Sequence, residues 1–334
     1  MARFQFIILC IIASALSCSC SKSETPVLIA TVEVTGITDV SARSGGIIVY
    51  GEEGGYKDKG VVWGTVADPT IENNSGRNTH TGNNSEFSSI IEGLNPGTVY
   101  YIRAYASNIL GTAYGDEQSF RTYLQGVNDI DGNTYYTIGI GSQEWMGTNL
   151  KTTRYLNGDS INFISLSQEW ESVTGAARTV YNSDIENERV FGSLYNWYAV
   201  TDDRGICPPG WRVPGDEDWK VLERELGMST SSSNRSGLRD RYAGGKLKER
   251  GTARWNGPNI LATDEYGFRA LPGGYIDIKG NSQTRDRNGN WWTSTELHEI
   301  NAIYRNLYHE NAGIYRSGIH KNSGFSVRCM KEIM

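Results

Sequence analysis

The chain has 334 residues, a formal net charge of -6, 21% charged residues and a mean hydropathy of -0.46. A mildly acidic sequence without a basic stripe has little attraction for phosphate backbones, which argues against nucleic-acid binding. Beyond the N-terminal region no apolar run is long enough to cross a bilayer, so we expect no membrane-spanning helix there.

The first residues have the composition of an export signal. Arg3 supplies one positive charge, and residues 4–16 are almost wholly apolar. This run is too short for a hydrocarbon core of ~30 Å, but it is typical of the hydrophobic region of a signal peptide. We therefore expect the chain to be exported.

Small residues lead into a cysteine at the end of this run, in the order Leu16-Ser17-Cys18. The segment resembles the bacterial lipobox, in which the cysteine is acylated and becomes the mature N-terminus. The resemblance implies a lipoprotein signal peptide over residues 1–17, acylation of Cys18 and a polar tether over residues 18–27. Cys20 is the alternative acylation site, and an ordinary secretory signal is the alternative interpretation. Acyl chains contribute ~0.8 kcal/mol per buried CH₂, so they would hold the protein on a membrane.

Residues 28–122 are predicted to form an all-β domain, because short apolar runs alternate with Gly, Asn and Asp clusters. Residues 94–100, Leu-Asn-Pro-Gly-Thr-Val-Tyr, and residues 103–108, Arg-Ala-Tyr-Ala-Ser-Asn, resemble the E–F turn and F strand of fibronectin type III-like sandwiches. The resemblance implies that the Tyr100 hydroxyl bonds back to upstream backbone, as in a tyrosine corner. We interpret this immunoglobulin/fibronectin III-like sandwich as a spacer rather than a binding module.

Residues 127–333 differ in composition from the preceding residues and are predicted to form a second domain of the α+β class. Eight of the nine tryptophans lie here, and glycines recur between them without a fixed period. One helix is expected over residues 215–226, where one face is apolar and Gly227 follows, and a shorter helix over residues 192–200. Short strands are expected near residues 136–140, 267–271, 290–294, 302–308 and 325–329.

Two cysteines remain beyond the N-terminal region, Cys207 and Cys329. An even pair in an exported chain favours one disulfide, which would close a long loop and contribute ~4–5 kcal/mol on the chain-entropy model. A reactive thiol pair is the alternative interpretation.

Several sequence motifs of residues 127–333 occur together in one order. They are Asp129-Ile130-Asp131-Gly132-Asn133-Thr134-Tyr135, Gly141-Ser142-Gln143-Glu144-Trp145-Met146-Gly147-Thr148-Asn149-Leu150, Leu194-Tyr195-Asn196-Trp197-Tyr198-Ala199, Cys207-Pro208-Pro209-Gly210-Trp211-Arg212-Val213-Pro214, Gly267-Phe268-Arg269-Ala270-Leu271-Pro272-Gly273-Gly274-Tyr275, Trp291-Trp292-Thr293-Ser294-Thr295 and Ser326-Val327-Arg328-Cys329. As a set they resemble the Fibrobacter succinogenes major paralogous domain, over about residues 127–331. The resemblance implies a surface or secreted protein and leaves its ligand open.

A second resemblance concerns the fold of this domain. A helix segment with Trp197, then Cys207, residues 212–214 and a second helix follow the order seen in C-type lectin-like domains. This resemblance implies a C-type lectin-like fold, with Cys329 on the terminal strand as the partner of Cys207. Residues 211–219 also resemble the corresponding segment of formylglycine-generating-type enzymes, which share that fold.

No sequence pattern supports catalysis or a bound metal. Asp129-x-Asp131-Gly132 looks like the start of a calcium loop, but an EF-hand needs a glutamate near the position of Ile140. A turn with Asn133 in a left-handed conformation explains the segment better. The four histidines lack zinc-ligand spacing, and there is no nucleophile elbow or phosphate loop. We therefore expect a protein that is not an enzyme and that has no metal or cofactor.

Aromatic residues are the best candidates for ligand binding, because sugar rings stack on exposed aromatic faces. Trp291 and Trp292 are adjacent in an expected strand and should point to opposite sides, so at least one would leave the main core. The alternative is that one packs inside and the other covers a loop. The residues that could line the same region are Tyr304, Tyr308, Tyr315, Arg285, Arg287 and Arg305.

These features together predict a lipid-anchored binding or adhesion protein of the outer membrane or cell surface. Its partners would be the membrane, through the anchor, and a glycan or an envelope protein recognised by the C-terminal domain. Two alternatives remain open: a structural envelope or assembly component, and an enzyme of the formylglycine-generating type, which would need free, accessible thiols.

Overall fold

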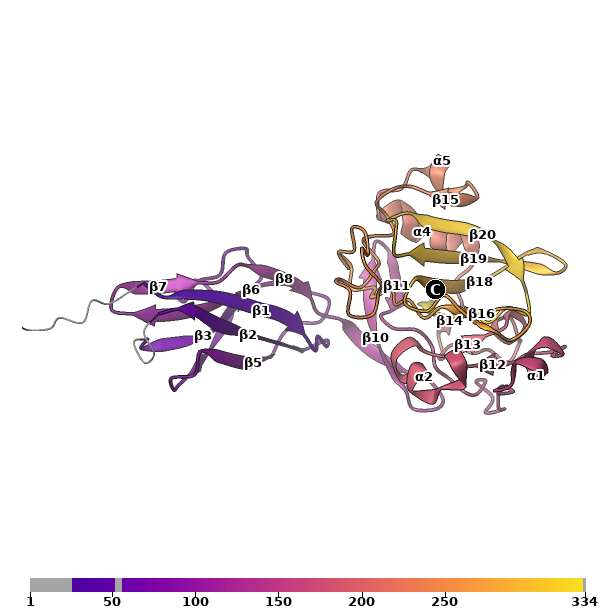
Figure 1. Ribbon diagram of the computed structural model, residues 1–334, viewed down its shortest axis with the longest axis horizontal. Coiled ribbons are helices and arrows are strands. Elements are labelled where there is room, and N and C mark those ends of the chain that lie inside the picture. Colours follow the sequence, from indigo (N-terminus) through magenta and orange to yellow (C-terminus); the bar gives the residue numbers. More distant parts are fainter. Residues whose placement is uncertain (1–25, 52–55, 333–334) are drawn as a thin grey trace, which may run out of the picture.

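The computed structural model describes residues 26–51 and 56–332 and arranges them as two domains joined end to end (Figure 1). The predicted signal peptide, Cys18, Cys20 and most of the tether lie outside the described residues. In the described part of the chain, no helix is long and apolar enough to cross a membrane. Strands dominate both domains, so the chain is mostly β-sheet.

The first domain is a sandwich of two antiparallel sheets. One sheet has the order β1-β2-β5, with β1 at Leu28–Thr35, β2 at Ser41–Tyr50 and β5 at Glu86–Glu92. The other has the order β4-β3-β6-β7, with β8 also paired to β6; β3 is Asp58–Gly64, β4 Gly76–His80, β6 Val99–Asn108, β7 Gly111–Tyr114 and β8 Gln118–Arg121. In β5 Phe87, Ser89 and Ile91 are buried and every intervening residue is exposed. This strict alternation puts one face of the strand against the opposite sheet.

The predicted tyrosine corner is present. The backbone N–H of Asn95 donates to the Tyr100 hydroxyl at 3.0 Å, and the Tyr100 ring is 3% exposed beside Phe120, with ring centroids 5.8 Å apart. The hydroxyl thus ties the turn before β6 to the strand itself.

Replacing Tyr100 by Phe should lower the free energy of unfolding of the first domain by about 1 kcal/mol, because the Asn95 N–H loses its partner while the ring stays packed. Urea unfolding followed by circular dichroism measures this loss. Tyr101→Phe is the matched control, since Tyr101 is only half-buried and its hydroxyl makes no hydrogen bond with the described residues. Equal losses in the two variants would contradict a specific role for the corner.

The second domain contains two main sheets. The first has the order β14-β21-β11-β10-β9, with β9 at Leu124–Asn128, β10 Thr134–Ile140, β11 Gln143–Met146, β14 Trp211–Arg212 and β21 Met330–Lys331. The second has the order β15-β20-β19-β18, with β15 at Gly237–Arg239, β18 Asn288–His298, β19 Asn301–Tyr308 and β20 Ile314–His320. Two small antiparallel pairs complete it, β12 (Arg178–Thr179) with β13 (Leu194–Tyr195), and the hairpin of β16 (Tyr275–Ile276) with β17 (Ser282–Gln283).

The helices of the second domain are short. They are α1 Ser167–Glu171, the 3₁₀ turn η1 Tyr181–Ser183, α2 Ile185–Phe191, α3 Trp197–Val200, α4 Asp216–Glu225 and α5 Thr230–Ser233. The expected helix over residues 215–226 is therefore confirmed as α4, with Gly227 at φ 103° directly after the C-cap residue Leu226.

Three expected elements are wrong or only partly right. Residues 192–200 form β13 and then α3, because Asn196 caps a new helix by accepting from the Ala199 N–H at 3.1 Å. Residues 267–271 form no strand, since Arg269 is left-handed at φ 47°. Residues 325–329 make only isolated bridges to strands, and the regular strand starts at Met330.

The turn at Asp129 is present, but its left-handed residue is not the predicted one. The Asp129 carboxylate accepts from the backbone N–H groups of Asp131 at 3.0 Å and Asn133 at 2.9 Å, as expected of a turn rather than a calcium loop. The left-handed residue, however, is Gly132 at φ 82° and not Asn133. Glycine takes that position because it has no Cβ to clash.

The Cys207–Cys329 disulfide is confirmed, and both cysteines are buried. It joins the segment before β14 to the segment before β21, which are 122 residues apart in the chain. The reactive-thiol interpretation is therefore not supported.

Only two residues separate the sandwich from the second domain, and both are buried. Thr122 is 1% exposed and donates its hydroxyl proton to Asn95 O at 2.6 Å. Tyr123 is 5% exposed, donates its N–H to Thr38 O at 3.0 Å and stacks on Tyr136 of β10, with centroids 5.4 Å apart. The junction is thus packed against both domains instead of being a free linker. The first sheet of the second domain accordingly begins at Leu124, three residues before the expected boundary.

Candidate functional site

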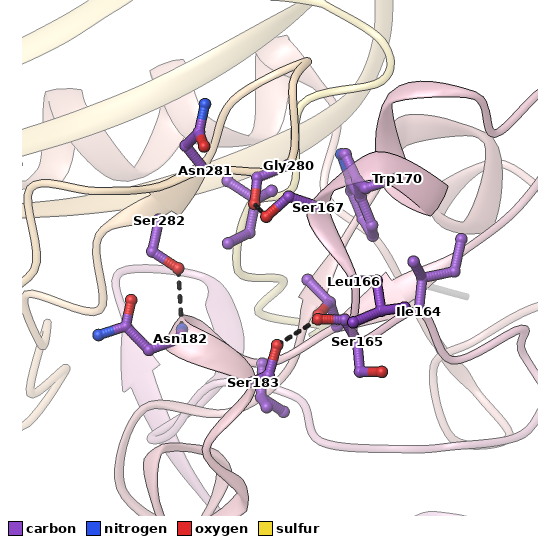
Figure 2. A pocket seen from close by; sticks show the side chains of 13 residues that line it. Ile164, Ser165, Leu166, Ser167, Trp170, Asn182, Ser183, Gly280, Asn281 and Ser282 are labelled. Atoms are coloured by element: carbon purple, nitrogen blue, oxygen red, sulfur yellow. Dashed lines mark hydrogen bonds between the residues drawn. The ribbon is translucent and has the colours of Figure 1, made fainter.

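A cavity of about 430 Å³ opens at the end of the second domain that faces away from the first domain (Figures 1 and 2). Three segments form its walls: residues 164–170, which lead into α1; residues 179–183, which run from β12 into η1; and the β16–β17 hairpin. The volume lies within the ~300–1,000 Å³ range of small-molecule sites.

Serine hydroxyls tie the three walls to one another in pairs (Figure 2). Ser167 Oγ donates to Gly280 O at 2.9 Å, and Ser183 Oγ donates to Ser165 O. Asn182 N donates to Ser282 Oγ at 2.8 Å. Each pair of walls is therefore held by one hydrogen bond, which sets the shape of the cavity before any ligand arrives.

The cavity keeps polar groups available for a ligand. In the described part of the chain no hydrogen bond engages the side-chain amide of Asn182, which is exposed. Ser282 Oγ accepts from Asn182 N and retains its own proton as a donor. The other polar lining residues are Ser165, Ser167, Thr179, Ser183 and Asn281, and the apolar ones are Ile164, Leu166, Trp170, Val180 and Ile276.

Two consecutive residues of the cavity wall adopt left-handed backbone conformations. Asn182 has φ 53° and Ser183 has φ 55°. Such conformations cost of order 1–2 kcal/mol for residues with a Cβ, and they persist only where the surroundings hold them. Here the hydrogen bonds to Ser282 and Ser165 do so, and backbone strain of this kind concentrates at binding sites.

The hairpin tip requires glycine where it meets the α1 wall. A Cβ on Gly280 would lie 2.5 Å from Ser167 Cα, and the residue has φ 77°. Asp277 holds the tip in shape by accepting from Lys279 N and Asn281 N, both at 2.9 Å. The close approach of Gly280 to Ser167 is thus built into the hairpin.

None of the thirteen lining residues ionises, so the cavity offers hydrogen bonds and apolar contacts rather than acid–base or nucleophilic chemistry. In the ranges that the structure describes, no three His, Cys, Asp or Glu side chains gather as a metal site would require. The arrangement fits a neutral ligand that both donates and accepts hydrogen bonds.

The two tryptophans expected to bind ligand are buried instead. Trp291 is 1% exposed and donates its indole N–H to Asn149 Oδ1 at 2.8 Å, and Trp292 is 0% exposed and donates to Tyr195 O at 2.8 Å. They do point to opposite sides of β18, but each side has its own hydrophobic core. Neither indole therefore presents a face to a ligand, which corrects the expectation that one would leave the core.

The other residues expected beside them do not form one site. Arg305 is fully buried between Glu223 and Asp216, at 2.6 and 2.8 Å. Arg285 donates to Asn187 Oδ1 at 2.8 Å, and Arg287 is exposed in the loop before β18. The three tyrosines are half-buried: Tyr308 meets the His309 ring edge to face, while Tyr304 and Tyr315 are neighbours with centroids 6.2 Å apart.

The cavity residues were missed from the sequence because small polar side chains carry no spacing signal. Ser167 and Gly280, which touch, are 113 residues apart. The available clue was the hairpin sequence from Asp277 to Asn281, which has the Asp-Ile-x-Gly-Asn order of the turn at Asp129.

A second cavity, of about 560 Å³, lies in the groove between the two domains and is lined by charged residues of both signs. Glu249 pairs there with Arg254 and Arg269, at 2.5 and 3.2 Å. Asp264 accepts from Arg269 N at 2.7 Å. Burial raises the pKa of Asp264 to about 7, although Arg269 and Arg328 act in the opposite direction.

This pKa predicts a decline in stability between about pH 4 and pH 7. The native state binds the Asp264 proton more tightly than the unfolded chain, whose ordinary value is 3.8, so the stabilisation is complete below that value and is lost as the pH rises through about 7. Solvent screening of the partly exposed side chain makes this contribution smaller than the full pKa shift would give, and we expect it to be on the order of 2 kcal/mol. In urea titrations between pH 4 and pH 8, the free energy of unfolding of Asp264→Asn should change less with pH than that of the wild type. The same pH dependence in both proteins would contradict the role of Asp264.

One family profile and several solved structures are similar to parts of this chain. The profile of the Fibrobacter succinogenes major domain matches residues 138–331, and no curated protein matches the chain. Among solved structures, the sensor domain of the anti-sigma factor RsgI4 in Pseudobacteroides cellulosolvens is 22% identical, over 30% of this chain and 98% of that chain, with a TM-score of 0.25. The FN1-FN3 domains of chicken CNTN1 are 19% identical, over 30% and 31% of the two chains, with a TM-score of 0.22. A fibronectin type III domain derived from human KIAA0970 protein is 13% identical, over 32% and 79%, with a TM-score of 0.22.

Proposed function

The chain belongs to the Fibrobacter succinogenes major domain family, and we propose that it is a lipid-anchored, non-catalytic binding protein of the outer membrane or cell surface. Its C-terminal domain recognises a neutral glycan in the cavity between α1, η1 and the β16–β17 hairpin. The observation that carries the proposal is that this cavity is uncharged, rich in hydroxyl and amide groups, and held open by its own serine hydrogen bonds.

The lining chemistry favours a sugar over other ligands. A pyranose presents hydroxyls that both donate and accept, together with apolar C–H groups. Ser282 and Asn182 supply free donors and acceptors, while Ile164 and Ile276 supply apolar contacts. A phosphate or carboxylate ligand would lack a counter-charge here.

The placement of the cavity supports a surface role. It lies at the end of the long molecule opposite the sandwich domain, which follows the lipobox-like segment in sequence (Figure 1). The packed junction at Thr122 and Tyr123 makes the sandwich a stiff spacer. A lipid anchor at Cys18 would therefore hold the cavity away from the membrane.

The alternative of a formylglycine-generating-type enzyme is disfavoured, because Cys207 and Cys329 are joined to each other and buried. The alternative of a structural envelope component is an outcome of the binding test. Stable co-purification with one envelope protein, with no glycan bound, would favour it.

The test is a screen of neutral and charged polysaccharides against the soluble chain from Ser21 onward, with calcium or with EDTA. We expect a neutral glycan to bind equally in both. Asn182→Ala should weaken its binding about tenfold, since an amide that contacts the ligand is lost.

A glycine pair provides the matched control. Gly280→Ala should abolish binding, because its Cβ pushes the hairpin away from Ser167. Gly158→Ala introduces the same left-handed backbone strain at φ 92°, but its Cβ meets no other atom, so this variant should bind normally. Unchanged binding in Asn182→Ala and Gly280→Ala, with melting temperatures near that of the wild type, would contradict this site.

A further inference from the structure

We propose that Tyr275, Tyr304 and Tyr315, on the other face of the β16–β17 hairpin, form a second subsite that stacks against a further sugar unit of the same neutral glycan. The inference rests on the proposed function, because it takes the ligand class from the cavity. It adds that the ligand is a chain of several units rather than a single sugar.

Two of the three rings pack on one buried residue, and the third packs on one of those two. Phe325 is 1% exposed, and its ring centroid lies 5.4 Å from that of Tyr275 and 5.0 Å from that of Tyr304. Tyr315, on the neighbouring strand β20, lies 6.2 Å from Tyr304. Buried aromatic packing below therefore fixes the partly exposed rings in position.

The hydroxyls of these tyrosines are available to a ligand. All three side chains are half-buried, and in the described ranges none of their hydroxyls makes a hydrogen bond. Burial raises the pKa of Tyr304 to about 12 and also raises that of Tyr275, so both remain neutral donors at physiological pH. Tyrosines packed this way usually direct their polar end toward a partner or solvent.

The neighbours of the rings between β19 and β20 are polar, while Trp292 and Leu238 lie opposite Tyr304 and Tyr315 on the outer sides of these two strands. In the strand register Tyr304 lies opposite Ser317, and Tyr315 lies opposite Asn306. The ionisable groups that act on Tyr304 are the two other tyrosines, and the one that acts on Tyr275 is Asp277. Aromatic faces flanked by a hydroxyl and an amide match the apolar C–H face and the hydroxyl rim of a pyranose.

The hairpin connects this face to the cavity. Ile276 and Ser282 pair with each other and line the cavity, while Tyr275 pairs with Gln283 one position along. Successive side chains of a strand point to opposite faces, so Tyr275 lies on the face away from the cavity. Each strand of the hairpin has two residues, a length of ~7 Å, so an oligosaccharide of several units that crosses its edge reaches both sites.

The test measures affinity against chain length. Isothermal titration of the soluble chain from Ser21 onward uses a series of one to eight units of the neutral glycan that binds best in the screen. We expect affinity to rise in two steps, first when the cavity is filled and again when the chain reaches the tyrosines. Tyr315→Ala should remove the second step, which lowers affinity for the longest member about tenfold and leaves the shortest binder unchanged.

Two further variants separate stacking from folding. Tyr315→Phe keeps the ring and should retain most of the second step. Tyr242→Ala removes a tyrosine that is 65% exposed elsewhere and should change nothing. A second step that survives in Tyr315→Ala, or an equal loss for short and long chains, would overturn the subsite and leave the proposed function in place. If no neutral oligosaccharide of any length binds the wild type, both proposals fail. Binding of an apolar peptide to the wild type that is lost in Tyr315→Ala would reassign the tyrosines to a protein partner.

Discussion

Replacing Cys207 and Cys329 by serine is expected to lower the free energy of unfolding of the second domain by about 4–5 kcal/mol. The disulfide spans 122 residues of a domain with short strands and long loops, so cutting it returns a large loop-closure entropy to the unfolded chain. Guanidinium unfolding followed by tryptophan fluorescence measures this loss, because eight of the nine tryptophans lie in the second domain.

The first domain is the internal control for this prediction. It holds no cysteine in the described residues, so its transition, including the signal of Trp63, should not move. Reduction of the wild type with dithiothreitol under denaturing conditions should reproduce the loss. A loss below 1 kcal/mol would mean that other contacts tie the segment before β14 to the segment before β21.

Replacing Glu223 by glutamine is expected to destabilise the second domain by about 3–5 kcal/mol. Glu223 is 0% exposed and accepts from Arg239 at 2.7 Å and from Arg305 at 2.6 Å. Neutralising this buried carboxylate leaves the Arg239 guanidinium with only the Ser233 carbonyl as a partner and leaves Arg305 paired with Asp216 alone. The variant also weakens the contact of α4 with β15 and β19, so thermal unfolding should begin earlier.

Glu217→Gln on the same helix is the matched control. Glu217 pairs with Lys220 at 2.7 Å, but its side chain is 79% exposed, so its loss should cost less than about 0.5 kcal/mol. Similar effects in the two variants would contradict a specific contribution from the buried network. Within that network burial alone would raise the pKa of Asp216, but Arg316 and Arg305 hold it well below its usual range.

Local patterns predicted the parts of the fold that depend on nearby residues. The strand alternation around Tyr100, the turn before it and the apolar face of α4 are visible within windows of about ten residues. The Cys207–Cys329 pairing followed from counting, since only two cysteines remain in the folded part. These elements needed no knowledge of the tertiary arrangement.

Long-range packing decided the rest. The burial of both Trp291 and Trp292 depends on cores on both faces of β18, which no pattern around those residues reveals. The cavity depends on contacts such as that of Asn182 with Ser282, 100 residues away. Serine and asparagine are common in loops, so their convergence could not be distinguished in the sequence from ordinary surface polarity.

Nuclear magnetic resonance of the soluble chain labelled with ¹⁵N-asparagine tests directly whether the cavity binds a neutral glycan. We expect that the best oligosaccharide from the screen shifts the side-chain amide resonances of Asn182 and Asn281, which line the cavity, and leaves that of Asn78 in the sandwich domain unchanged. Saturation binding that leaves the Asn182 and Asn281 resonances in place would contradict the claim.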